Sequence, residues 1–243
     1  MSDLRTRLGR AWPLVGVMIV VIVVALVCVG LYVGDRYAHR RAEGRVAAAL
    51  QPPLGTPARP QVDIEGFPFL TQIAAGSVGK MQIVADQLGE TTNAPVILAH
   101  ADLVMTDVVT TDWFKTMKIT HTEGTGLIDY TKLSSLTNAP LRYGSEGRVE
   151  IVVKTTVVGR EVEAVITGAP RLNADEQTMT LSDAKISVAG VNLPDFTAQA
   201  LLAALLKPIP LKGLPLGLTV TGITAAEDGV HVALMAENQT ISS

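Results

Sequence analysis

The amino-acid sequence predicts an α+β protein in which an N-terminal transmembrane helix is followed by a curved antiparallel β-sheet, or half-barrel, wrapped on long helices. Three observations lead to this fold class. A run of twenty residues near the N-terminus carries no charge. Many later segments have apolar residues at every second position, which is the period of a β-strand. The order of the elements, a helix, then strands, then a helix and a terminal hairpin, favours an α+β arrangement.

The uncharged run, residues 14–33, is long enough to cross a bilayer as a helix. At about 1.5 Å per residue it spans roughly 30 Å, the thickness of the hydrocarbon core. Trp12 and Tyr32 stand near its two ends, where aromatic side chains prefer the membrane interface. A cleavable signal peptide has a shorter apolar region that a small-x-small site follows closely. Cys28, the only cysteine, follows Val27 rather than the small residue of a lipoprotein signal, so we predict that it is buried in the membrane.

The charges on either side of the run bear on its orientation. Arg5, Arg7 and Arg10 precede it, and Arg36, Arg40 and Arg41 follow it closely, so the basic charges on its two sides are nearly balanced. The short basic tail, residues 1–13, favours the cytoplasm, which predicts a single-pass protein of the cell membrane with residues 34–243 outside. Without the first 33 residues, which hold three Arg and one Asp, the chain has 17 basic and 22 acidic side chains. This acidic balance argues against nucleic acid as a partner.

Residues 34–61 combine a predicted amphipathic helix with a proline-rich connection. Ala38, Ala42 and Val46 recur at helical spacing. The last ten residues before the first predicted strand contain four prolines and one glycine, a composition typical of a stiff, extended linker. The β-rich domain is therefore predicted to occupy residues 62–243.

That domain contains a series of predicted antiparallel strands. They share an alternation of apolar and polar residues and are bounded by turn-forming residues. They are residues 62–65, 80–88, 96–106, 117–123, 148–158, 161–171, 177–188, 218–224 and 230–237. Two helices are predicted between them, at residues 127–136 and at residues 195–207, where Pro208 prevents continuation.

One of these strands carries apolar residues on both of its faces. Ile97, Leu103 and Met105 belong to one face, and Leu98 and Val104 belong to the other. An antiparallel sheet with water on one side has one polar face, so this pattern predicts a sheet with a helix on one face and other apolar material on the second. That material is either core side chains or a lipid. Aliphatic rather than aromatic faces suit flexible acyl chains.

The sequence contains only weak indications of catalysis or metal binding. Ser77 lies one residue short of a nucleophile-elbow motif, but strand-like residues follow it where that motif needs a helix. His100 with Asp102, and His121 with Glu123, would hold a metal only if their strands paired in a suitable register. Solvent-facing polar residues explain them at least as well. We predict a non-catalytic protein without cofactor or metal.

The stretch GFPFLTQ, residues 66–72, holds two of the four phenylalanines of the chain. Gly66 gives the backbone freedom and Pro68 ends ladder pairing, so Phe67 and Phe69 are predicted at the edge of a strand, with both rings on one side. Either both rings plug one end of the core, or at least one ring forms the mouth of a lipid cavity. Phe69 is predicted to be the more structural residue, and Phe67 the residue at the mouth.

This stretch resembles the signature of the LmeA-type phospholipid-binding proteins of actinobacteria. The residues that carry the resemblance are Val62, Ile64, Gly66, Phe67, Pro68, Phe69, Leu70, Thr71, Gln72 and Gly76. The sequence Leu214-Pro215-Leu216-Gly217-Leu218 and the later Asp228-Gly229-Val230 resemble the C-terminal region of the family. The family often has an aromatic residue where this chain has Leu216. The resemblance covers roughly residues 36–237.

The resemblance implies a sheet wrapped on a long helix, similar to the tubular lipid-binding (TULIP, or bactericidal/permeability-increasing) fold. It implies a periplasmic position at the cell envelope and binding of phospholipids, including inositol lipids. It also implies a supporting role in elongating lipomannan-type glycolipids, with envelope-biosynthesis proteins as partners, and no catalytic site. The predicted lipid-binding residues are Phe67, Phe69, Leu70, Ile73, Ile97, Leu103, Met105, Leu201 and Leu205.

Two other functions remain open at this point. The first is a membrane-anchored adaptor of envelope enzymes, whose sheet is filled by its own side chains. The second is an anchored hydrolase that uses Ser77. A cavity of several hundred Å³ would favour lipid over the adaptor.

Overall fold

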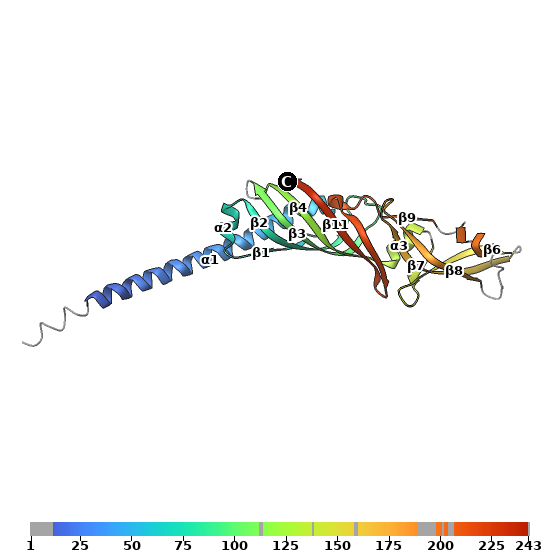
Figure 1. Cartoon of the computed structure of the whole chain (residues 1–243), viewed down its shortest axis with the longest axis horizontal. Coiled ribbons are helices and arrows are strands. Elements are labelled where there is room, and N and C mark those ends of the chain that lie inside the picture. The colour runs from blue at the N-terminus through green and yellow to red at the C-terminus, as the bar shows by residue number, and fades with distance from the viewer. Residues whose placement is uncertain are drawn as a thin grey trace, which may run out of the picture.

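The computed structural model describes residues 12–111, 114–137, 139–157, 160–188, 198–200, 202–203 and 207–242. Figure 1 shows an elongated molecule with a long helix projecting from one end and two β-sheets following one another along its length. The α+β fold class and the half-barrel sheet predicted from the sequence are confirmed.

The projecting helix is α1, Trp12–Leu54, and its two halves have different surroundings. From Val17 to Val33 its large apolar side chains are exposed, and the helix is long and apolar enough to cross a membrane. Beyond Val33, a single face of the helix is buried, through Ala42, Val46, Leu50 and Leu54. The amphipathic segment predicted after the apolar run is therefore the second half of a single continuous helix.

The predicted proline-rich linker is shorter than expected, because α1 continues through Pro52 and Pro53 to Leu54. Each proline lacks the N–H that would bond to the preceding turn. Leu50 and Leu54 are fully buried on either side of them, and this burial holds the last turn in place. The chain then leaves the helix at Gly55, whose φ of 65° favours glycine.

The first sheet has six antiparallel strands in the order β1-β2-β3-β4-β11-β10. Their bounds are β1 Gln61–Glu65, β2 Ser77–Leu88, β3 Leu98–Thr111, β4 Thr116–Ile128, β10 Thr219–Ala226 and β11 Gly229–Ser242. The second half of α1 contacts β1 at one edge of the sheet. It also contacts β11 and the short 3-10 helix η1, Pro215–Gly217, near the other edge. The sheet thus curls around the helix, and their apolar side chains form one core.

The prediction of two apolar faces on the strand at residues 96–106 is wrong for this sheet. Leu98 is buried in the same core as Leu103 and Met105, while Val104 is only half-buried. The burial pattern of β3 leaves two successive residues outward after Leu98, so the alternation shifts phase there. The paired strand has the same shift, next to Gln87 with φ 54°. Such an irregularity redirects side chains without ending the strand.

The second sheet has five antiparallel strands in the order β5-β6-β7-β8-β9. Their bounds are β5 Leu141–Tyr143, β6 Val149–Val157, β7 Arg160–Asn173, β8 Thr178–Val188 and β9 Ile209–Pro210. Helix α3, Tyr130–Thr137, contacts β5. It begins later than the predicted helix, because Leu127 and Ile128 belong to β4 and still pair with β11. In the helix predicted at residues 195–207, residues 198–200 and 202–203 are helical, and the other positions up to 206 lie outside the described residues.

The two sheets are joined through the turn between β7 and β8. The side-chain amide of Gln177 donates to the Val220 carbonyl at 3.0 Å, and its oxygen accepts the Val220 N–H at 2.8 Å. The Gln177 carbonyl accepts the Leu211 N–H at 2.8 Å. The Gln177 side chain therefore makes the same pair of hydrogen bonds to the edge strand β10 that the backbone of a neighbouring strand would make.

Candidate functional site

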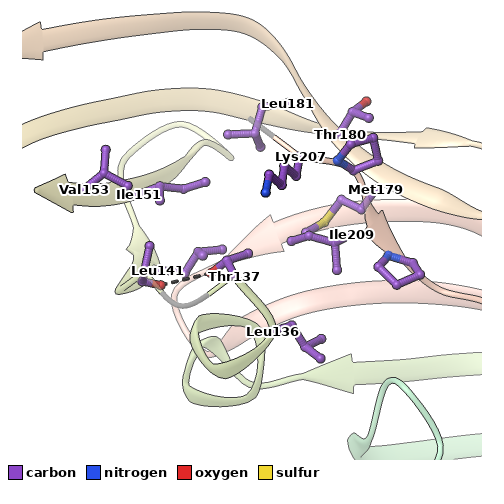
Figure 2. A pocket seen from close by; sticks show the side chains of 13 residues that line it. Leu136, Thr137, Leu141, Ile151, Val153, Met179, Thr180, Leu181, Lys207 and Ile209 are labelled. Atoms are coloured by element: carbon purple, nitrogen blue, oxygen red, sulfur yellow. Dashed lines mark hydrogen bonds between the residues drawn. The ribbon is translucent and has the colours of Figure 1, made fainter. Parts of the chain in front are cut away.

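A cavity of about 550 Å³ lies between α3 and the second sheet. Ten of its thirteen described lining residues have apolar side chains, as in most small-molecule sites. The lining residues are Leu136, Thr137, Ala139, Leu141, Ile151, Val153, Met179, Thr180, Leu181, Lys207, Pro208, Ile209 and Pro210. Figure 2 shows side chains from α3, β5, β6, β8 and β9 converging on this space.

The alternation of the strands explains why these side chains meet. Ile151 and Val153 are two residues apart on β6, and Met179 and Leu181 are two residues apart on β8, so each pair lies on one face of its strand. Ile209 of β9 is opposite Met179 in the ladder. Strands are predicted here from the sequence, but these residues are not among the predicted lipid-binding residues. Their two-residue apolar spacing was the available signal.

Polar side chains are a minority among the described residues that line this cavity. Lys207 is exposed and is the only charged residue among the described lining side chains. The Thr137 hydroxyl lies 3.0 Å from the Ala139 carbonyl oxygen, so that hydroxyl is already bonded within the protein. A mainly apolar space whose described lining includes one cation suits an amphiphile that carries a negative charge.

None of the seven predicted lipid-binding residues that the structure describes lines this cavity. Leu103 and Met105 are fully buried in the core between α1 and the first sheet. Ile97 is half-buried just before β3. Leu201 and Leu205 lie outside the described residues. Contact between these residues and lipid stays a prediction.

The other four predicted residues belong to α2, Phe69–Ala74, or precede it. Phe69 is 1% exposed and its ring lies 5.1 Å from the His39 ring, whereas Phe67 is 68% exposed. Leu70 is partly exposed, and Ile73 packs against the core. The depth of Phe69 agrees with its predicted structural role.

The prediction of a strand edge with both rings on one side is wrong. After Pro68 the chain turns into α2 instead of continuing extended. The Asp35 carboxylate of α1 accepts the Leu70 N–H at 2.8 Å, so a residue distant in the sequence satisfies a donor in the first turn of α2. The two rings consequently have different surroundings.

The polar clusters considered from the sequence do not assemble into a site. In the β3–β4 register His121 is opposite Thr106, six residues along β3 from His100, so the two histidine–carboxylate pairs are separate. His100 instead lies 2.7 Å from the Asp86 carboxylate. Ser77 is the first residue of β2 and no helix follows it, unlike in a nucleophile elbow.

A third cluster places His39, Glu43 and Asp63 with their ligand atoms within 4.8 Å of one another. The His39 Nε2 atom lies 2.7 Å from the Ile64 carbonyl oxygen and 3.5 Å from the Glu43 carboxylate. The short contact is that of a hydrogen bond from the ring N–H to the carbonyl. This bond links α1 to β1 and uses the ring nitrogen that lies near the Glu43 carboxylate.

A cavity of this size with a mainly apolar lining is typical of the class of protein that encloses apolar or amphiphilic ligands. Comparison with known families narrows this class. The chain belongs to the LmeA-like phospholipid-binding family, whose model matches residues 33–235, and this confirms the resemblance seen in the sequence. No curated protein and no solved structure matches the chain.

Proposed function

We propose that this protein is a non-catalytic, membrane-anchored phospholipid-binding protein that takes acyl-chain atoms into the cavity beside α3. The cavity is the observation that carries the proposal, since its volume of about 550 Å³ and its apolar lining suit a hydrocarbon chain. Lys207 at its margin would attract the phosphate of the head group, because a lysine ammonium group binds phosphate as a point charge. The family to which the chain belongs binds phospholipids.

The anchor in this proposal is the first half of α1. Its exposed apolar side chains would be costly in water and favourable in a bilayer. The basic residues of the tail at 1–13 support a cytoplasmic N-terminus and a periplasmic domain. An impermeant thiol reagent tests this orientation in intact cells. It should label Asp175→Cys in a Cys28→Ser background, and labelling only after lysis would refute the periplasmic position.

The cellular role that we propose is lipid handling at the cell envelope in support of lipomannan-type glycolipid elongation. Inositol phospholipids are the proposed ligands, and envelope-biosynthesis proteins are the proposed partners. The support for these finer statements is the resemblance of the GFPFLTQ stretch to the family signature. Deletion of the protein should reduce the length of envelope mannan chains, and unchanged chains would refute this role.

Photocrosslinking tests the lipid site directly. The full chain is reconstituted in vesicles that contain a phospholipid with a diazirine on its acyl chain, and crosslinked peptides are identified by mass spectrometry. We expect crosslinks on β6 and β8, around Val153 and Leu181. Val153→Trp should fill the cavity and reduce these crosslinks severalfold. The matched control is Val104→Trp, at a half-buried position of the first sheet outside the cavity, which should leave them unchanged.

An adaptor is the second candidate function, and the filled core of the first sheet favours it. Leu103, Met105 and Leu50 are fully buried there, so described side chains fill the core between α1 and the sheet. An adaptor predicts no acyl-chain crosslinks on β6 or β8. Their absence in folded protein would overturn lipid binding at the cavity.

A further inference from the structure

The junction between the apolar half of α1 and the first sheet exposes large apolar side chains. Phe67, 68% exposed, is the most exposed large apolar side chain that the structure describes. Leu70 is 38% exposed beside it, and Tyr32 of α1 is 52% exposed. Exposed aromatic rings that gather at one place mark an interaction surface more often than an ordinary region of a monomer surface.

The position of this surface along α1 is set by a ring contact. The centroids of the Tyr32 and Phe67 rings are 6.2 Å apart with the planes inclined at 56°, within the range of attractive aromatic pairs. Tyr32 belongs to the last turn of the apolar half of α1, and the helix continues through it without a break. Phe67 therefore lies at the level where the apolar half ends.

A hydrogen bond and a buried ring hold this surface against α1. Asp35, one turn after Tyr32, is 5% exposed, and its carboxylate accepts the Leu70 N–H at 2.8 Å. Phe69, between the two exposed residues, is buried against the His39 ring. Phe67 and Leu70 are thus presented by a segment that is tied down on both sides, and their exposure is a property of the fold.

Basic side chains follow within the next turns of α1. Arg36, Arg40 and Arg41 are exposed, and the Arg41 guanidinium lies 5.0 Å from the centroid of the exposed Tyr37 ring. Aromatic rings at one level and arginines just beyond them match a bilayer, where rings prefer the interface and arginines meet lipid phosphates.

We propose that Phe67 and Leu70, together with Tyr32, insert into the interface of the bilayer that holds α1, so that α2 seats the first sheet on the membrane. This surface has a role separate from the cavity beside α3, and it rests on the membrane anchor of the proposed function. The bilayer is the occupant that the geometry favours, because the surface is continuous with the apolar half of α1.

Depth measurements on the full chain test this proposal. Single-cysteine variants carry a nitroxide label in nanodiscs of phosphatidylcholine and phosphatidylglycerol, one chain per disc. Native Cys28 gives the bilayer reference, and Asp175→Cys in a Cys28→Ser background gives the aqueous reference. In the same background, the accessibility of the label at Phe67→Cys to a soluble nickel chelate should be lower than that of the label at position 175 by a factor of roughly three or more. Such protection is expected for a side chain that enters the interface.

A second label keeps the phenylalanine in place. With the label at Leu70→Cys, the additional change Phe67→Asp should restore chelate access, whereas the matched Phe67→Leu should not. Equal access at positions 67 and 175, with the label at Cys28 still protected, would overturn the inference and leave the anchor intact. Chelate access at Cys28 would overturn the anchor and this inference together, while acyl-chain crosslinking at the cavity is scored separately. Protection at position 67 that appears only with two chains per disc would assign the surface to a second copy and overturn membrane insertion.

Discussion

The two sheets of this protein bury apolar side chains in different ways. In the six-stranded sheet the second half of α1 lies in the curl, and side chains such as Leu54 and Leu103 are fully buried. In the five-stranded sheet Val153 and Leu181 occupy comparable inward positions, yet they stay half-buried and border a cavity of about 550 Å³. The same alternating pattern thus gives a filled core where a long helix lies along the strands. Among the described residues, the short α3 and β9 border the strands of the second sheet, and the same pattern leaves ligand-sized space there.

The largest expected effect on stability concerns the filled core between α1 and the first sheet. Phe69→Ala should lower the free energy of unfolding by about 3–5 kcal/mol, because the ring is 1% exposed and its removal leaves a cavity. Phe67→Ala is the matched control, and its stability should stay close to that of the wild type, since Phe67 is 68% exposed. Chemical denaturation of both full-length variants in the same detergent measures this. Equal losses would mean that the two rings share one core.

A pair of leucines compares the two sheets directly. Leu103→Ala should lower the free energy of unfolding by about 2–5 kcal/mol, as expected for a leucine in a closed core. Leu181→Ala should lower it by roughly 1 kcal/mol, because a half-buried side chain at the border of a cavity has less surface to lose. The second variant should also change the amount of co-purified phospholipid. Similar losses of stability would indicate that the second sheet is as tightly packed as the first.

Uncoupling the sheets should have an intermediate effect. Gln177→Ala removes two hydrogen bonds to the backbone of Val220, and we expect a loss of about 1–3 kcal/mol. Hydrogen exchange of the Val220 amide should accelerate, while that of the inner strands β3 and β4 stays the same. Gln177→Glu is the control that keeps the acceptor for the Val220 N–H. Unchanged exchange at Val220 in Gln177→Ala would contradict this link.

The smallest expected effect is a dependence of the free energy of unfolding on alkaline pH. It arises where α3 meets the first sheet. The Tyr130 hydroxyl donates to the Ala226 carbonyl at 2.7 Å, and burial, with smaller contributions from Tyr143 and Asp228, raises the pKa of Tyr130 from 10.0 to about 12. The folded state therefore holds this proton more tightly than the unfolded state. The resulting stabilisation is present below pH 10 and is lost as the pH rises from about 10 to about 12.

Tyr130→Phe isolates that contribution. Near neutral pH it should lower the free energy of unfolding by about 0.5–1.5 kcal/mol, the net value of one hydrogen bond. Between pH 10 and about 12 the difference from the wild type should shrink, because the wild type loses its own stabilisation there. Tyr143→Phe is the control for the other tyrosine nearby. A constant difference across this range would contradict the raised pKa.

The regular elements of both sheets could be predicted because their signal is local. The strands of β6 and β8 were expected within a few residues of their bounds, since apolar and polar residues alternate along them. β5 and β9 were missed, because three and two residues are too short for any periodicity. The two-faced reading of β3 failed because an irregularity beside Gln87 shifts the alternation, and a single sequence does not mark it.

The functional surfaces were harder to predict because they depend on residues that are distant in the chain. Leu136 and Ile209 border the same cavity although more than seventy residues separate them. The segment that forms α2 was predicted as an extended strand edge, because Gly66 and Pro68 are residues that end the pairing of a strand. The group that supports its first turn is Asp35, 34 residues before Phe69. Periodicity carries no information on such contacts.

The continuity of α1 has a mechanical consequence. A helix of 43 residues is about 65 Å long, and here no hinge separates the half that we assign to the bilayer from the half that carries the first sheet. With its first half in the bilayer, as we propose, the helix would couple its own tilt to the orientation of the domain. Bilayers of different thickness tilt an apolar helix to different angles, and the rigid shaft would pass each angle to the whole domain. Membrane thickness would thereby change the orientation of the cavity relative to the bilayer, with no change in the domain itself.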